Sequence, residues 1–359
     1  TLYDDVTLSE TIVTTENVTI DFAGKTIATS VKAITATNGA VVTLSDGTIT
    51  YTGSDETITG LVAETGAKLV LNKMTVSFPD GNVAIRLGDG NGGNGGMLEL
   101  TDSTVYGGAA GVGLFGSNNA EAPSSMTAKN SKIYYTKSFG ISTNGSFANN
   151  AITLENTDIL MNGDVPTGAG IYLAGAGTTD ITGGTIEGAT GIEIRAGKLT
   201  INEGTIVKAD GDYAVEPNGN GSTVVGVAIA VSQHTTERPI EVTVNGGTFN
   251  ATGENGKAFY ETDTVTGETE PSEDVTITID GGNFKAPVES ENKTGFVEGG
   301  NFTEVLAPEY VSDTADLYVT ANGYAVYDEG DTPAEGDTKV IAMVGDKAYD
   351  KLADAVAAA

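Results

Sequence analysis

The stretch Gly183-Gly184-Thr185-Ile186 is a clear copy of a short phrase that recurs along the chain. The phrase consists of a small or polar turn-forming pair, then Thr or a related polar residue, then an aliphatic residue or Phe. The apolar residue that ends each copy lies at Ile49, Val76, Val105, Ile133, Ile159, Ile186, Ile206, Phe249, Phe284 and Phe302. The first five intervals between these markers are 27, 29, 28, 26 and 27 residues. A period this regular indicates stacked structural units.

Each period contains short runs rich in β-branched residues, and Gly, Asn and Asp separate these runs. Residues 40–44 and 48–51 illustrate the pattern, which is typical of short strands joined by tight turns. Three such strands per period fit one coil of a parallel β-helix, in which stacked coils bury their inward Ile, Val and Leu side chains. We therefore predict an all-β fold. It is a right-handed, single-stranded parallel β-helix with three strands per coil and about 10–12 coils.

The spacing of the markers becomes irregular around residue 206, where the intervals change to 20, 43, 35 and 18 residues. We interpret the long intervals as loops added to one flank of the coils. Residues 1–306 are therefore expected to form the β-helix, with insertions at about residues 222–240 and 263–274.

The pattern changes again in the last part of the chain. We expect residues 307–327 to form a closing hairpin and residues 328–338 to form an exposed acidic linker. Residues 339–359 read as a strand followed by an Ala-rich helix that starts at Ala348. The apolar residues of this helix fall on one stripe, formed by Tyr349, Leu352 and Val356.

Composition excludes several classes of function. The chain has 359 residues and a formal net charge of −31, from 49 acidic and 18 basic residues. Nucleic-acid binding requires basic faces, so we expect no nucleic-acid partner. The chain has no Cys, which rules out disulfides and thiol chemistry. Its sequence has no apolar run of the roughly 18 residues that a membrane-spanning helix needs, so we expect no membrane insertion.

The two ends of the chain resemble a known family. The opening Asp5-Val6-Thr7-Leu8, followed by residues 18–27, resembles the start of pectate-lyase-like β-helix modules on large surface proteins of Gram-positive, often gut-dwelling, bacteria. Residues 299–326 resemble the closing hairpin of these modules, and residues 345–356 resemble the helix that precedes the next module. The resemblance covers nearly the whole chain and implies an extracellular or cell-surface location.

From this resemblance we expect a structural or adhesive role: a rigid rod in a secreted or surface-attached protein or filament, rather than an enzyme. The chain reads as one unit of a tandem or polymerising array, in which residues 341–359 cap the first coil of a following unit. The contact would join Tyr349, Leu352 and Val356 to Leu2, Tyr3 and Val6. The expected partners are neighbouring copies or flanking modules, and host or cell-wall glycans. A subunit whose whole function is polymerisation is a further reading.

The alternative is a carbohydrate-active β-helix, either a polysaccharide lyase or hydrolase or a glycan-binding domain. Glu193 and Arg195 occupy alternate positions of one expected strand and so share a face, and Asp210 and Asp212 follow one coil later. Pointing outward, these four residues form either an acid–base site or a solvated row of ion pairs.

Four tyrosines form a second candidate site, because they lie just after coil markers or in neighbouring strands. They form either a stacking row or a platform for sugar rings, and they are Tyr106, Tyr134, Tyr135 and Tyr172. The single histidine, His234, falls in the expected polar insertion, where we expect it to be exposed. We expect no cofactor and no defined metal site, and the acidic surface favours only diffuse Ca²⁺ binding.

Overall fold

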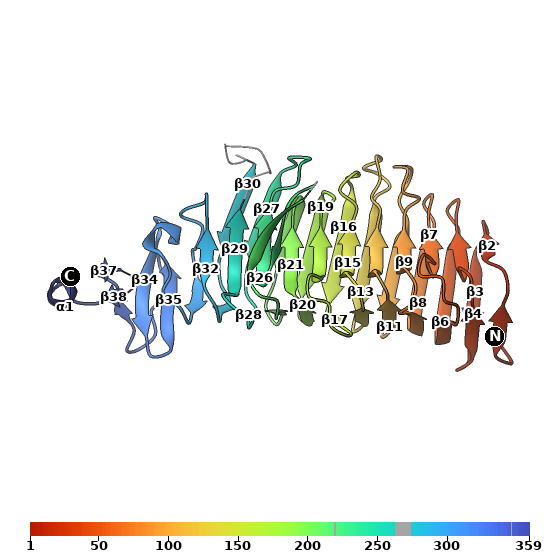
Figure 1. Cartoon of the computed structure of the whole chain (residues 1–359), viewed down its shortest axis with the longest axis horizontal. Helices are drawn as coiled ribbons and strands as arrows, with labels where there is room; N and C mark the ends of the chain where they lie inside the picture. Colours follow the sequence, from red (N-terminus) through yellow and green to blue (C-terminus); the bar gives the residue numbers. More distant parts are fainter. Residues whose placement is uncertain (219, 263–273, 346) are drawn as a thin grey trace.

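A computed structural model describes residues 1–218, 220–262, 274–345 and 347–359 of the chain. It is almost entirely β, with 52% of residues in strands and 3% in helix, and its sheets are long and parallel. The predicted all-β class is therefore confirmed, and the sheets are compatible with a β-helix. The molecule is elongated, and the two termini lie at opposite ends (Figure 1). The predicted acidic insertion at residues 263–274 lies outside the described residues, apart from Asp274.

The parallel pairings form three ladders, which we call together the ladder stack. The first ladder contains β3 (Val18–Asp21), the start of β6 (Val41–Tyr51), the start of β8 (Lys68–Phe78), β10 (Met97–Thr101), β13 (Ser124–Lys129), β16 (Asn150–Glu155), β19 (Gly177–Thr182), β22 (Gly197–Ile201), β27 (Ile240–Val244) and β30 (Val275–Ile279). The second contains β1 (Val6–Leu8), β4 (Thr26–Thr29), the ends of β6 and β8, β11 (Thr104–Gly107), β14 (Lys132–Tyr135), β17 (Asp158–Met161), β20 (Thr185–Gly188), β23 (Ile206–Ala209), β28 (Thr248–Ala251), β31 (Asn283–Phe284) and β33 (Gly300–Phe302).

The third ladder forms its own eleven-stranded sheet. It contains β2 (Ile12–Thr14), β5 (Ile34–Ala36), β7 (Leu61–Ala63), β9 (Val83–Leu87), β12 (Ala110–Leu114), β15 (Phe139–Thr143), β18 (Ala169–Leu173), β21 (Thr190–Ile194), β26 (Val227–Ser232), β29 (Lys257–Thr262) and β32 (Val288–Ser290).

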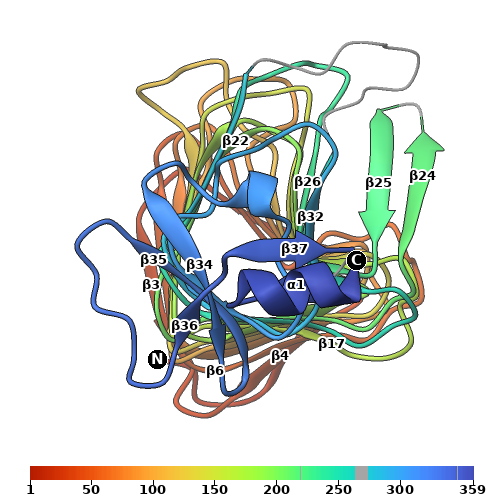
Figure 2. The same cartoon turned by 90° about the vertical axis from the view of Figure 1, so that its left-hand side faces the viewer.

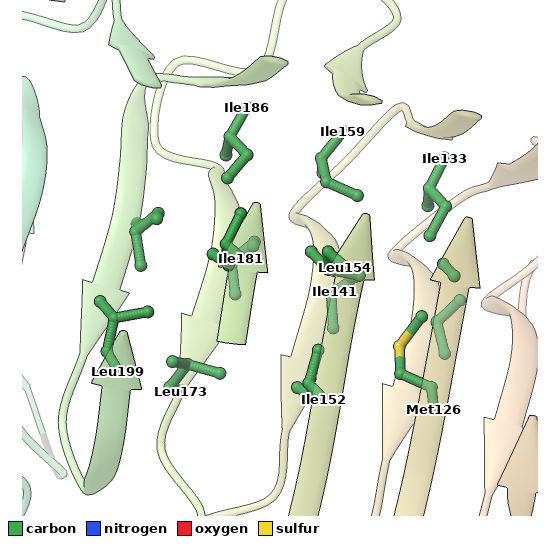
Figure 3. Close-up of a cluster of buried hydrophobic side chains, with 14 of the residues drawn as sticks. Met126, Ile133, Ile141, Ile152, Leu154, Ile159, Leu173, Ile181, Ile186 and Leu199 are labelled. Carbon is green, nitrogen blue, oxygen red and sulfur yellow. The ribbon is translucent and has the colours of Figure 1, made fainter. Parts of the chain in front are cut away.

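The apolar core lies between the ladders and consists of side chains in register from strand to strand. Ile133 pairs with Ile159, and Ile159 pairs with Ile186, so that one row of isoleucines follows the second ladder. Figure 3 shows this row beside the neighbouring row that includes Leu154 and Ile181. Each strand alone could not bury these side chains, because the partners that cover them come from the next repeat.

The second residue of four consecutive strands in the third ladder is glycine, at Gly111, Gly140, Gly170 and Gly191. A Cβ atom on Gly140 would lie 2.0 Å from the Ile159 Cγ2, and on the other three glycines it would lie between 2.3 and 2.6 Å from a side chain of the second ladder. This glycine column therefore lets the side chains of the second ladder, including the isoleucine row, contact the backbone of the third ladder.

Two details of the repeat differ from the expectation. The marker chosen at Ile206 is exposed, and the residue in register with Ile186 is Val207. The turn before it, where Gly204 has a φ of +79°, shifts the register by one residue. The expected insertion at residues 222–240 is also wrong, because β26 within it is a buried strand of the third ladder. The chain leaves the stack earlier, as an antiparallel hairpin of β24 (Ala214–Asn218) and β25 (Gly221–Val225).

Antiparallel strands close the C-terminal end. A short 3₁₀ turn, η1 (Pro308–Tyr310), precedes β34 (Ala315–Thr320), which pairs with both β35 (Gly323–Asp328) and β36 (Thr338–Lys339), and β35 also pairs with β33. Beyond them, β37 (Ala342–Val344) pairs with β38 (Lys347–Tyr349), and α1 (Leu352–Ala358) packs on this pair. The expected helix from Ala348 is therefore too long: Tyr349 is in a strand, because its backbone pairs with Ala342, and it does not share a helical stripe with Leu352.

Candidate functional site

Glu193 lies near the end of β21, between two residues of the main core. Ile192 and Ile194 face that core, so Glu193 faces outward, in register with Tyr172 of β18 and Ala230 of β26. It is nevertheless only 1% exposed. The reason is the hairpin β24–β25, which stands outside the third ladder (Figure 2) and contacts β21 and β26 through β25. Of the two readings of this cluster, the solvated row of ion pairs is therefore wrong for Glu193.

Hydrogen bonds fasten the hairpin to this carboxylate. The Val224 amide donates to Glu193 Oε1 at 3.1 Å, and the Ser232 hydroxyl donates to the same oxygen at 2.8 Å. The Thr190 hydroxyl donates to the Val224 carbonyl at 2.6 Å. Val224 also belongs to a small apolar cluster with Val227, Ala230 and Tyr260 that is separate from the main core.

Arg195 is fully buried beside Glu193, so it is not part of a solvated row of ion pairs either. Its Nη1 donates to the Tyr172 hydroxyl at 2.7 Å, and its Nη2 donates to the Asn220 carbonyl. The guanidinium also lies 5.8 Å from the centre of the Tyr172 ring. Arg195 therefore connects the third ladder to the end of the hairpin.

Burial determines the ionisation of this cluster. It raises the pKa of Glu193 to about 7, although the positive charge of Arg195 and the two hydrogen bonds act in the opposite direction. Burial also lowers the pKa of His234, and the positive charges of Arg195 and Arg238 lower it further. His234 is buried, not exposed as expected, and its Nδ1 accepts a hydrogen bond from the Thr236 amide.

The pKa of Glu193 leads to a test on stability. Its folded value of about 7 lies above the ordinary value of 4.5, so the folded protein holds this proton where the unfolded chain releases it. The associated stability is fully present below pH 4.5 and is lost as the pH rises through 7. We expect Glu193→Gln to remove this loss, which is on the order of 3 kcal/mol, in urea unfolding curves measured across that pH range. The lowered pKa of His234 contributes in the opposite direction, but equally in the unmodified chain and in the variant. If the free energy of unfolding fell with pH as steeply in Glu193→Gln as in the unmodified chain, the prediction would be contradicted.

A pocket of about 310 Å³ opens between the hairpin and the third ladder. Its wall includes Phe139 and Tyr172, whose rings stack with their centres 4.7 Å apart. The remaining lining consists of Ser138, Thr167, Ala169, Thr190, Glu193, Glu216, Pro217, Thr223 and Val224. A buried carboxyl with a raised pKa in such a pocket is a candidate functional group.

Asp210 and Asp212 line a separate pocket of about 410 Å³, together with Asp164 and Glu216. Partial burial raises the pKa of Asp210, and the charges of Glu187 and Asp164 raise it further. Asp212 accepts a hydrogen bond of 2.7 Å from the Glu254 amide. The structure thus places Glu193 in one pocket and Asp210 and Asp212 in another, and Arg195 lines neither; the two pockets share Thr167 and Glu216.

The four tyrosines do not form one platform. Tyr106 and Tyr134 are half-buried and stack with ring centres 4.7 Å apart. Tyr135 is fully buried and donates to the Glu187 carbonyl at 3.0 Å, so it is not available to a ligand. Tyr172 stacks on Phe139, a partner that the sequence did not indicate.

The residues expected to mediate assembly lie at the two ends of the molecule. Tyr3 is 92% exposed, whereas Leu2 and Val6 are partly buried against the core. At the other end, Leu352 and Val356 are 62% and 68% exposed.

No helix among the described residues is long and apolar enough to cross a membrane. Within the same residues, no group of three or more His, Cys, Asp or Glu side chains is arranged to hold a metal ion. Comparisons with protein families, with curated proteins and with solved structures found no match for this chain.

Proposed function

We propose that this chain is a structural module of an extracellular bacterial surface protein or fibre, in which rods join end to end. In this proposal the three ladders form a right-handed β-helix with three strands per coil, in keeping with the usual hand of parallel crossovers. The resemblance of its opening and closing stretches to surface modules supports the location. The distribution of exposed apolar side chains carries the proposal.

Most exposed large apolar side chains among the described residues lie at the two ends of the rod. Tyr3, Ile12 and Val13 are at the N-terminal end, and Ile341, Leu352 and Val356 are at the C-terminal end. Only Ile206 and Val215 lie between them. Apolar surface that is exposed on two opposite ends favours contact between successive units.

The two ends also differ in how their strands are paired. Among the described residues, the first strand of each ladder has a partner on one side only: β1 pairs with β4, β2 with β5, and β3 with β6. The C-terminal end is instead closed by antiparallel strands. An unpaired strand edge is a template for another chain, so the open end accepts a partner and the closed end supplies one.

Charge favours the same arrangement. Residues 1–21 contain five acidic residues and no Lys or Arg, whereas residues 339–359 contain three Lys and three Asp. Lys339 belongs to β36 and is ion-paired with Asp316, so the β37–β38–α1 segment has two Lys and three Asp and is close to neutral in a chain whose net charge is −31. This segment is therefore repelled less by the acidic first coil than a strongly acidic segment of the same chain would be. The occupant of the open end is accordingly the β37–β38–α1 segment of a second copy.

Substitution of the apolar residues at one end tests this assembly. We expect the unmodified chain to form oligomers that grow with concentration in light scattering and to appear as end-to-end filaments in negative stain. The pair Leu352→Asp and Val356→Asp should weaken association by about tenfold or more, because charged groups would be buried at the contact. The pair Tyr3→Asp and Val13→Asp should have the same effect from the opposite end.

The matched control is Ile206→Asp with Val215→Asp, which changes exposed apolar residues in the middle of the rod and should leave assembly unchanged. Compact monomers of the unmodified chain at every concentration would refute the proposal. Loss of assembly with the C-terminal pair alone would show that the partner surface is not the first coil.

A further inference from the structure

The pocket beside Glu193 has no part in the end-to-end contact, because it opens on the flank of the rod. It lies at the lower end of the size range of ligand pockets, roughly 300–1,000 Å³, with a volume of about 310 Å³. A space of this size is sufficient for one small ring. Its mouth includes the exposed residues Thr167, Glu216 and Pro217, so a ligand can enter from solvent.

The chemistry of the wall selects the ligand. Phe139 and Tyr172 are half-buried, and one face of each ring is covered by the other. The remainder of the pair gives the pocket an apolar wall, which suits the C–H face of a ring. The Ser138 and Thr167 hydroxyls form no hydrogen bond with other described residues and can bond to ligand hydroxyls. The lining also has two carboxyls, Glu193 and Glu216, and no basic side chain.

We infer that this pocket binds a single neutral sugar residue. An aromatic wall combined with hydroxyl and carboxyl groups matches a ring that has an apolar face and a rim of hydroxyls. Sugar acids are disfavoured, because their carboxylate would face Glu193 and Glu216 without a cation in the lining. Arg195 does not provide that cation: it does not line the pocket, and its donors are directed to Tyr172 and to the Asn220 carbonyl.

The experiment uses the full chain and simple sugars. The probes are the methyl glycosides of glucose, galactose, mannose and N-acetylglucosamine, with glucuronic and galacturonic acid as charged comparisons. Saturation-transfer NMR detects binding, and titration gives the affinity. We expect at least one neutral glycoside to bind with a Kd of about 1 mM or tighter, and the sugar acids to bind at least about tenfold more weakly.

Three variants locate the binding. Thr167→Tyr fills the mouth of the pocket from an exposed position, and we expect it to abolish measurable binding. Phe139→Ala removes half of the aromatic wall and should weaken binding by about tenfold. Thr127→Tyr is the matched control, because it makes the same substitution at an exposed position of β13. Thermal unfolding establishes that each variant is folded.

Three results would overturn the inference. They are the absence of binding for every neutral glycoside, binding of a sugar acid as strong as that of the neutral sugars, and binding that Thr167→Tyr leaves intact. The residues Leu352 and Val356 do not line the pocket. The chain that carries the pair Leu352→Asp and Val356→Asp should therefore bind sugar as the unmodified chain does. Failure of assembly and failure of sugar binding are therefore distinguishable.

Discussion

Gly140→Val is expected to lower the free energy of unfolding by about 3 kcal/mol or more. Gly140 is buried in the glycine column, where a Cβ atom would lie 2.0 Å from the Ile159 Cγ2 and 2.6 Å from the Gly170 carbonyl oxygen. The isoleucine row can move only if the ladders separate, and separation would break contacts in the adjoining repeats. Urea unfolding followed by circular dichroism measures the loss.

A double-mutant cycle between Gly140→Ala and Ile159→Ala tests the stated cause. Ile159→Ala alone should cost about 2–5 kcal/mol, because it leaves a cavity. In the double variant the new methyl group of residue 140 occupies part of that cavity. The loss of stability in the double variant should therefore be smaller than the sum of the two single losses by at least about 1 kcal/mol. Additive losses would mean that the close approach to Ile159 does not require the glycine.

Arg195→Leu is expected to destabilise the protein by about 3–5 kcal/mol at pH 8. At that pH the Glu193 carboxyl is ionised in the folded protein, since its pKa is about 7. Arg195 supplies the positive charge that offsets it, and both side chains are fully buried. The substitution also removes the hydrogen bonds to Tyr172 and to the Asn220 carbonyl. Urea unfolding at pH 8 measures the effect.

The double variant Glu193→Leu with Arg195→Leu provides the comparison for this prediction. It removes both buried charges and fills the space with apolar groups, so we expect it to recover most of the stability lost in Arg195→Leu. Equal losses in the single and double variants would show that the buried charge of Glu193 is not the cause. The loss in Arg195→Leu should also shrink at pH 5, where Glu193 is protonated in the folded state.

The sequence predicted the β class and the position of the isoleucine row because the repeat is a local signal. Ile133, Ile159 and Ile186 were identified as equivalent from spacing alone, and they are in register. The prediction was wrong at Ile206, because a single residue in a turn changes which neighbour faces inward. It was also wrong for β26, because the long interval between markers was interpreted as an insertion although it contains the apolar run of a buried strand.

The candidate site was only partly predictable. Alternation along one strand indicated that Glu193 faces away from the core, and this is what the structure shows. Its burial could not be predicted, because the cover comes from the β24–β25 hairpin, whereas the sequence spacing had placed an insertion at residues 222–240. Asn218-Gly219-Asn220-Gly221, between two apolar stretches, is a hairpin-turn signal that would have located this cover. Nothing local indicated that Ser232 or Val224 would donate to Glu193.

The direction of the ladder hydrogen bonds has a mechanical consequence. Strands in each ladder lie across the long axis of the molecule, so the bonds between strands run along it (Figure 1). A pulling force on the two ends therefore breaks the hydrogen bonds of one repeat after another and does not shear a whole sheet at once. Each repeat that peels away replaces about 5 Å of rod with a chain of roughly 90 Å. In the proposed fibre, such rods would resist bending and yield under tension by lengthening from their ends.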